Sequence, residues 1–438
     1  MANERNFLLG KGEKLAAIAE VAQPYSPTKN PYTLGDRQKV LIPEARQLSQ
    51  QLDELPESAC PEDEAVAVLT LHPAYISKSA FPSALLKAAS LRAVGSRQVI
   101  VTPKRWTKKG DPKPQPTTEL FVAGSRASFH NLPKVVSEAV ERLPASRDII
   151  KIESLRAIPP ADRVKPIKST ADQPLLEVVL HAGNHPRANT ILEGFRQYLH
   201  SLEIDVDLER RIDAGELTFV PVRAPRNRVK DIAKFSFLRV AREMPKLRQF
   251  QPGAAVASRP VVRCVLPIGK DVVDPTIKVA VFDGGFPDIP ALSPWVRRLK
   301  GDGVVAPSDP YLEHGLQVTS ALLFGPLKNG TMAPVPYAKV DHYRVLDEES
   351  DADPQTELYP VLRRISKILE TGRHDFVVLC IGPAIPVDDD DVNPWTATLD
   401  GIAASGRTLI AVAVGNSGKA SAPDKLNRVQ PPSDGVTE

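Results

Sequence analysis

Three polar residues in the second half of the sequence stand beside strongly apolar runs, where reactive side chains are often placed. Asp283 follows VAVF and precedes two glycines, His314 opens a segment with helical apolar spacing, and Asn416 follows IAVAVG. A carboxylate can orient an imidazole, the imidazole can move a proton near neutral pH, and an amide can stabilise a developing oxyanion. Taken singly, each residue also fits an ordinary role in a turn or a core. Together they predict a catalytic site.

The segments around these residues predict a parallel sheet with helices between its strands. Almost continuous apolar runs, typical of buried parallel strands, lie at 277–282, 339–345, 376–381 and 409–414. Helical spacing occurs between them, near 356–371 and 395–405. In such β/α sheets, ligands bind beyond the carboxyl ends of the strands. Asp283 and Asn416 both occupy such positions.

The combined motifs resemble those of the subtilisin-like serine proteases, or subtilases. The shared pattern is strand-Asp-Gly-Gly, then His-Gly-x-x-Val-x-Ser opening a helix, then strand-Gly-Asn-Ser-Gly. The resemblance implies a parallel α/β fold and an Asp, His, Ser triad in that chain order. It makes Asp283 the orienting carboxylate, His314 the general base and Asn416 the donor to the oxyanion. Gln317 stands where the family often has a second histidine.

A further segment of the resemblance concerns the peptide substrate. The run FVVLCIGP at 376–383 is similar to the family's strand whose end lines the substrate pocket. The resemblance implies that Cys380, Ile381 and Gly382 pair with an extended peptide as an added strand. Val378 and Cys380 replace the usual Asn and Ser of that strand. After an apolar strand, Cys380 is more simply a buried structural thiol than a nucleophile.

The family's nucleophile motif, Gly-Thr-Ser-x-Ala, does not occur in the 438 residues. Ser320 belongs to the histidine segment, Ser417 to the predicted oxyanion turn, and Ser433 has no such context. We therefore expect the catalytic domain, 275–438, to be incomplete and the chain as given to be inactive. The alternative is a natural pseudoprotease that holds peptides without cutting them.

The preceding residues predict two α+β units with the βαββαβ order of ferredoxin-like folds. They are assigned to 61–157 and 173–250, after an N-terminal extension at 1–60 without sustained periodicity. Subtilase propeptides have the same order, so the second unit is interpreted as an inhibitor or chaperone, or as a plain accessory domain. The expected strands are 65–71, 98–101, 119–122, 148–152, 175–180, 204–206, 217–222 and 235–240, and the expected helices are 81–91, 132–143, 190–202 and 227–233.

The net charge and the cysteine content limit which partners and which cell compartment can be expected. A net charge of +3 over 438 residues argues against nucleic acid as a partner, and no apolar run reaches membrane-spanning length. The basic and aromatic residues at 104–109 are better interpreted as an exposed hairpin. Cys60, Cys264 and Cys380 lack disulfide or zinc spacing. We expect a cytoplasmic protein that acts on a peptide or protein.

Two weaker signals complete the predictions. The acidic run from Asp388 to Asp391 could bind Ca²⁺ or favour basic substrates, although a solvated loop is the simpler interpretation; no other cofactor is expected. The opening NFLLGKGEKL is similar to bacterial subtilases paired with an AAA ATPase in plasmid-incompatibility and phage-defence systems. That resemblance implies an AAA ATPase as a partner.

Overall fold

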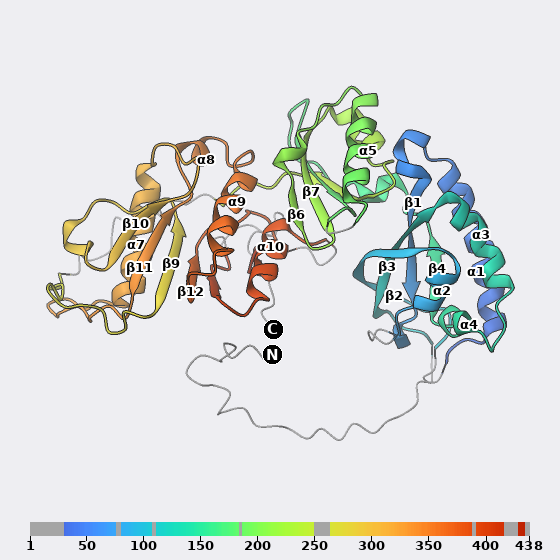
Figure 1. The fold of residues 1–438 in the computed structure, drawn as a ribbon, viewed down its shortest axis with the longest axis horizontal. Helices are drawn as coiled ribbons and strands as arrows, with labels where there is room; N and C mark the ends of the chain where they lie inside the picture. The colour runs from blue at the N-terminus through green and yellow to red at the C-terminus, as the bar shows by residue number, and fades with distance from the viewer. Residues whose placement is uncertain are drawn as a thin grey trace, which may run out of the picture. The chain divides into compact units, whose positions relative to one another are not determined.

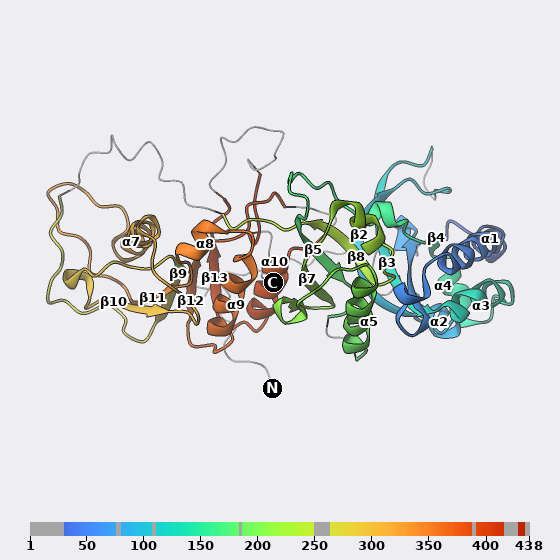
Figure 2. The same cartoon turned by 90° about the horizontal axis from the view of Figure 1, so that it is seen from above.

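The computed structural model divides into two compact units (Figures 1 and 2). Among the described residues, unit 2 contains those up to Met244 together with Asp391 and Val392, and unit 1 contains the rest. Among the helices in the described ranges, none combines the length and apolarity that a bilayer crossing needs. The structure describes residues 30–75, 80–106, 111–183, 186–248, 263–387, 391–415 and 428–433.

Unit 1 is built on a five-stranded parallel sheet with the order β10-β11-β9-β12-β13. The α/β prediction is confirmed in this coarse form, and all four expected strands are present with slightly different ends. The fifth strand, β10, was not predicted because it lies at the edge of the sheet and reads VRRLK, without an apolar run. The strands are β9 (Lys278–Asp283), β10 (Val296–Lys300), β11 (Lys339–Arg344), β12 (Phe376–Leu379) and β13 (Leu409–Val412).

Helices connect these strands along the chain. Helix α7 packs Leu323 and Phe324 into a core with Val279, Val281 and Val340 of the sheet. Helix α9 buries one apolar stripe and is followed by Gly372, whose φ of 60° suits a helix end. The helices are α7 (Asp309–Phe324), α8 (Glu348–Ala352), α9 (Leu358–Leu369) and α10 (Pro394–Ala403).

The first sheet of unit 2 is antiparallel, with the order β2-β3-β1-β4 and the expected βαββαβ connections. An additional helix, α1, packs Leu41, Leu48 and Leu52 into the same core, so part of the expected extension at 1–60 belongs to this unit. Pro43 inside α1 concealed the helical spacing. The elements are α1 (Leu34–Asp53), β1 (Glu64–Leu71), α2 (Ser83–Ala88), β2 (Arg92–Val101), β3 (Gln115–Ser125), α3 (Arg126–Ser137), α4 (Pro144–Ile149) and β4 (Ile152–Arg156).

The second sheet of unit 2 repeats the pattern with the order β6-β7-β5-β8, all antiparallel. Three strand predictions were misplaced to different extents. The range 204–206 lies entirely before β6, 148–152 overlaps β4 only at Ile152, and the first half of 235–240 lies before β8. Ile204, Phe235 and Phe237 are buried outside strands, so their apolarity reflected burial rather than a strand. The elements are β5 (Leu175–Leu180), α5 (Ala188–Ser201), β6 (Ile212–Ala214), β7 (Leu217–Arg223), α6 (Val229–Ile232) and β8 (Leu238–Glu243).

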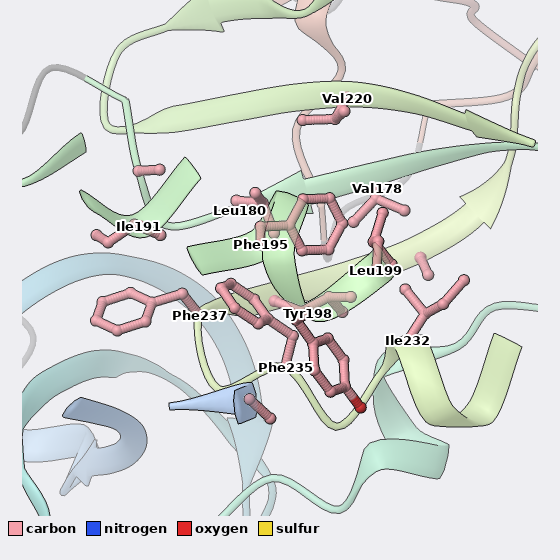
Figure 3. Close-up of a cluster of buried hydrophobic side chains, with 14 of the residues drawn as sticks. Val178, Leu180, Ile191, Phe195, Tyr198, Leu199, Val220, Ile232, Phe235 and Phe237 are labelled. Carbon is pink, nitrogen blue, oxygen red and sulfur yellow. The ribbon is translucent and has the colours of Figure 1, made fainter. Parts of the chain in front are cut away.

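One hydrophobic core joins both sheets of unit 2. Figure 3 shows its aromatic centre, where the ring centroids of Phe195 and Phe235 are 5.0 Å apart and those of Tyr198 and Phe235 are 5.8 Å apart. Val68 and Phe121 of the first sheet belong to the same cluster. The two expected units therefore form one body with a shared interior.

Candidate active site

The structure brings Asp283 and His314 together at the carboxyl end of β9. Asp283 is the last residue of that strand and its side chain is only 1% exposed, while the His314 side chain lies in α7 and is 16% exposed. The imidazole Nδ1 lies 2.9 Å from Oδ1 of Asp283 and 2.8 Å from Oδ2. A carboxylate at this distance favours the tautomer with the proton on Nδ1, which leaves Nε2 able to accept a proton.

Glycines allow α7 to lie directly on the turn that follows β9. A Cβ atom on Gly315 would come within 1.9 Å of the Gly285 carbonyl oxygen, and one on Gly284 would come within 2.1 Å of Tyr311 Cβ. The backbone N–H of Gly284 also donates to Oδ1 of Asp283 over 2.6 Å. The Asp-Gly-Gly and His-Gly pairs thus set the distance between carboxylate and imidazole.

His342 lies in β11 beside this pair and was not predicted as a site residue. Its side chain is buried, and its Nδ1 is 2.8 Å from the Thr319 hydroxyl of α7. Burial lowers the pKa of His342 to about 4, with the nearby Asp283 raising it and His314 lowering it further. At neutral pH His342 is therefore an uncharged support beneath the pair. A histidine in the apolar part of VDHYRVL was the available signal.

The predicted peptide-binding residues follow β12, next to Asp283. The parallel register pairs Leu379 with Phe282, so Cys380 and Asp283 are the next residues on neighbouring strands. Burial, and then the charge of Asp283, raises the pKa of the Cys380 thiol to about 11, while Arg248 lowers it. A thiol with that pKa is protonated at neutral pH, which agrees with a structural role. Ile381 is buried, and the Gly382 carbonyl accepts a hydrogen bond from the Arg248 backbone.

Asn416, the predicted oxyanion donor, lies outside the described residues, as does Ser417. The described chain beyond β13 reaches Gly415, whose φ is 120°. A Cβ atom there would come within 3.0 Å of the Gln430 side chain. The approach to the predicted turn is therefore closely packed.

The acidic run differs from its interpretation as a solvated loop at the one position that can be compared. Asp391 is 6% exposed, lies 3.0 Å from Arg239 Nε and lies 3.6 Å from Lys165 Nζ. Asp388, Asp389 and Asp390 fall outside the described residues. Within the described ranges, no three His, Cys, Asp or Glu side chains gather as metal ligands. Asp391 thus takes part in a buried ion-pair network of unit 2 and is not a solvated loop residue.

Comparison with models of known protein families finds no match to this chain, and comparison with curated proteins finds none either. What the site can do must therefore be judged from its own residues.

Proposed function

We propose that this chain carries the Asp–His part of a subtilisin-like serine endopeptidase. The observation that supports the proposal is the buried carboxylate of Asp283 at the end of the central parallel strand. Its two oxygens lie 2.8–2.9 Å from Nδ1 of the His314 imidazole. The motif resemblance and the parallel sheet agree with it. Asn416 is the proposed oxyanion donor, and Cys380, Ile381 and Gly382 are the proposed start of the peptide-binding edge.

In the proposed reaction, His314 Nε2 takes the proton of a serine hydroxyl as the serine oxygen attacks the peptide carbonyl carbon. Asp283 stabilises the resulting imidazolium, and the imidazolium returns the proton to the leaving amine. His342 supports the pair without adding charge. No Gly-Thr-Ser-x-Ala motif occurs among the 438 residues, so none of their serines is proposed as the nucleophile.

The second candidate function is a peptide-binding scaffold without cleavage. One observation favours it: residues 246–248 already pair with 382–384 in the manner of an added strand. An AAA ATPase is the partner proposed for either function, on the resemblance of the N-terminal residues.

The deciding experiment measures peptide hydrolysis by the full-length protein. The D283A and H314A variants are expected to lose activity by a factor on the order of 10⁴ or more, as for other triad members. Matched controls are D271A and H130A, whose side chains are exposed and lie outside the site. Equal hydrolysis by all five proteins would contradict the endopeptidase. Peptide binding without hydrolysis would favour the scaffold.

A further inference from the structure

Strands β10 and β11 lie side by side in register at one edge of the sheet of unit 1 (Figure 1). The register places Arg298 beside His342 and Lys300 beside Arg344. Alternate residues of a strand project from the same face of a sheet, and neighbours in register share that face. The Nδ1 atom of His342 lies 2.8 Å from the Thr319 hydroxyl of α7, so all four side chains are on the face that α7 covers.

The opposite face of the same two strands has balanced charges. Arg297 and Asp341 are in register there, and the guanidinium donates to both carboxylate oxygens over 2.6–2.8 Å. On the α7 face, Lys300 and Arg344 are in register although both are cations, and within the described ranges neither forms an ion pair. Like charges on neighbouring strands repel each other. The α7 face therefore carries positive charge that is not neutralised at Lys300 and Arg344.

The four side chains line a cavity of about 340 Å³ in unit 1. The turn after β9 contributes Phe286 to its wall, and the beginning of α7 contributes Leu312. This volume lies at the lower end of the range for small-molecule binding sites. The cavity thus combines cationic side chains with an apolar wall.

The charged residues of the lining favour an anion. Arg298, Lys300 and Arg344 are cationic at neutral pH. Burial lowers the pKa of His342 to about 4, so that residue is uncharged at neutral pH. Among the described lining residues, Asp288 alone is acidic, and its carboxylate is 76% exposed and lies 3.1 Å from Arg298 Nη2. An ion pair this exposed contributes little stability, so an anionic ligand can replace it.

Phosphate is the anion that matches these donors best. The guanidinium of Arg344 donates through Nη1 to the Val305 carbonyl, and it has further N–H groups that can bind oxygen atoms. Guanidinium and ammonium groups form charge-assisted hydrogen bonds with phosphate oxygens. Phe286 and Leu312 offer apolar contact to a group esterified to that phosphate.

We infer that this cavity binds a small organic phosphate ester, with its phosphate between Lys300 and Arg344 and its organic group against the apolar wall. The inference goes beyond the proposed function and does not rest on it, because neither Asp283 nor His314 lines the cavity. The ester would lie one strand away from the candidate active site, since Arg344 is in register with Asp283 of β9. The sequence alone could not indicate the site, because it depends on the register of β10, an edge strand without an apolar run.

Titration calorimetry of the 438-residue chain with phenyl phosphate, in a buffer without phosphate, tests the site. The K300Q variant is expected to bind at least fivefold more weakly than wild type, because it loses one of the two cations that hold the phosphate. Lys300 is exposed, so K300Q should fold as wild type does. The matched control K339Q removes an exposed lysine of β11 outside the cavity and should bind as wild type does. Equal affinities of wild type and K300Q, or no binding by wild type, would overturn the inference.

Two further ligands separate the contributions of charge and apolar contact. Inorganic phosphate is expected to bind wild type at least threefold more weakly than phenyl phosphate, because it makes no contact with the apolar wall. Benzyl alcohol, which has the ring without the phosphate, should not bind measurably. Equal binding of inorganic phosphate and phenyl phosphate would overturn the assignment of an organic ester, and equal binding of benzyl alcohol would overturn the assignment of an anion.

A charge reversal tests the site without any ligand. The K300E variant places a carboxylate beside Arg344, so its melting midpoint should lie roughly 1–3 °C above that of wild type. The K339E variant loses the ion pair of Lys339 with Asp271 and should show no rise. An unchanged or lower midpoint for K300E would show that Lys300 and Arg344 do not repel each other, and it would overturn the inference.

Discussion

The two units bury their sheets to different extents. In unit 2, Phe195, Phe219 and Phe235 have no exposed surface, because two antiparallel sheets close on a shared core. In unit 1, Val377 and Leu379 are buried on one face of β12, but Leu409 on the neighbouring β13 is 43% exposed. A cavity of about 310 Å³ lies over the face of the sheet that carries Phe376, Val378 and Ala411. Its lining also includes Val279 and Leu322.

The difference indicates that unit 2 contributes mainly stability, whereas unit 1 carries the residues of the candidate site. Unit 2 gathers its large aromatic residues where no water reaches them, which is the arrangement that contributes most to folding free energy. Unit 1 places its titratable residues at the carboxyl ends of its strands and leaves part of its apolar surface open. Substitutions should therefore cost most at fully buried positions, such as the aromatic centre of unit 2, and least at the open face of unit 1.

The largest effect is expected for F235A, at the aromatic centre of unit 2. Loss of a fully buried phenylalanine leaves a cavity and should lower the free energy of unfolding by about 3–5 kcal/mol. Hydrogen exchange followed by mass spectrometry should show faster exchange in β5 and β8, with β9 and β12 unchanged. Equal loss of protection in both units would show that their stabilities are not separate.

An intermediate effect is expected from acid, through His342 of unit 1. The pKa of His342 is about 4 in the folded chain, against about 6.5 for an unperturbed histidine. Between about pH 6.5 and pH 4 the unfolded chain binds a proton at this histidine that the folded chain does not bind. The free energy of unfolding is therefore unaffected by His342 above about pH 6.5 and falls as the pH drops toward 4, by roughly 3 kcal/mol at most. The H342Q variant should lack that part of the pH dependence.

Urea unfolding at pH 7 and pH 4.5 measures this loss. Trp295 and Trp395 report from unit 1 by fluorescence, and both are buried there. The control is H130Q, which alters an exposed histidine beside Asp53. If H342Q loses as much stability between the two pH values as wild type does, His342 is not the group responsible.

The smallest effect is expected for L409A at the open face of unit 1. Because the side chain is already 43% exposed, its removal should cost less than about 1 kcal/mol. The matched variant L379A removes a fully buried leucine from the adjacent strand and should cost about 2–5 kcal/mol. Similar losses of unfolding free energy for both variants, measured in urea, would mean that the face is covered in solution.

Local pattern predicted much of the architecture. The apolar runs of β5, β9, β11, β12 and β13 were assigned close to their true bounds, because short continuous apolar runs between turns are typical of strands. Helix α1 was missed since Pro43 interrupts its pattern, and β10 was missed since edge strands need not be apolar. Propensity was outweighed by tertiary context in both elements.

The candidate site was only partly predictable for a similar reason. Asp283 and His314 stand in local motifs, with glycines that report a close approach. His342 has no such motif, because its place in the site arises from contacts with residues distant in the chain. The role of a buried polar residue is recognised from its hydrogen-bond partners, and the sequence alone does not show which residues those are.

The pairing of Asp391 with Arg239 has a consequence for how this protein can be divided into fragments. Unit 2 is discontinuous, since it takes Asp391 from a loop between β12 and α10. A gene fragment ending at Met244 would encode the largely buried Arg239 without its carboxylate, and removing one partner of a buried ion pair commonly costs about 3–5 kcal/mol. A continuous segment ending at Met244 therefore lacks part of the ion-pair network of unit 2.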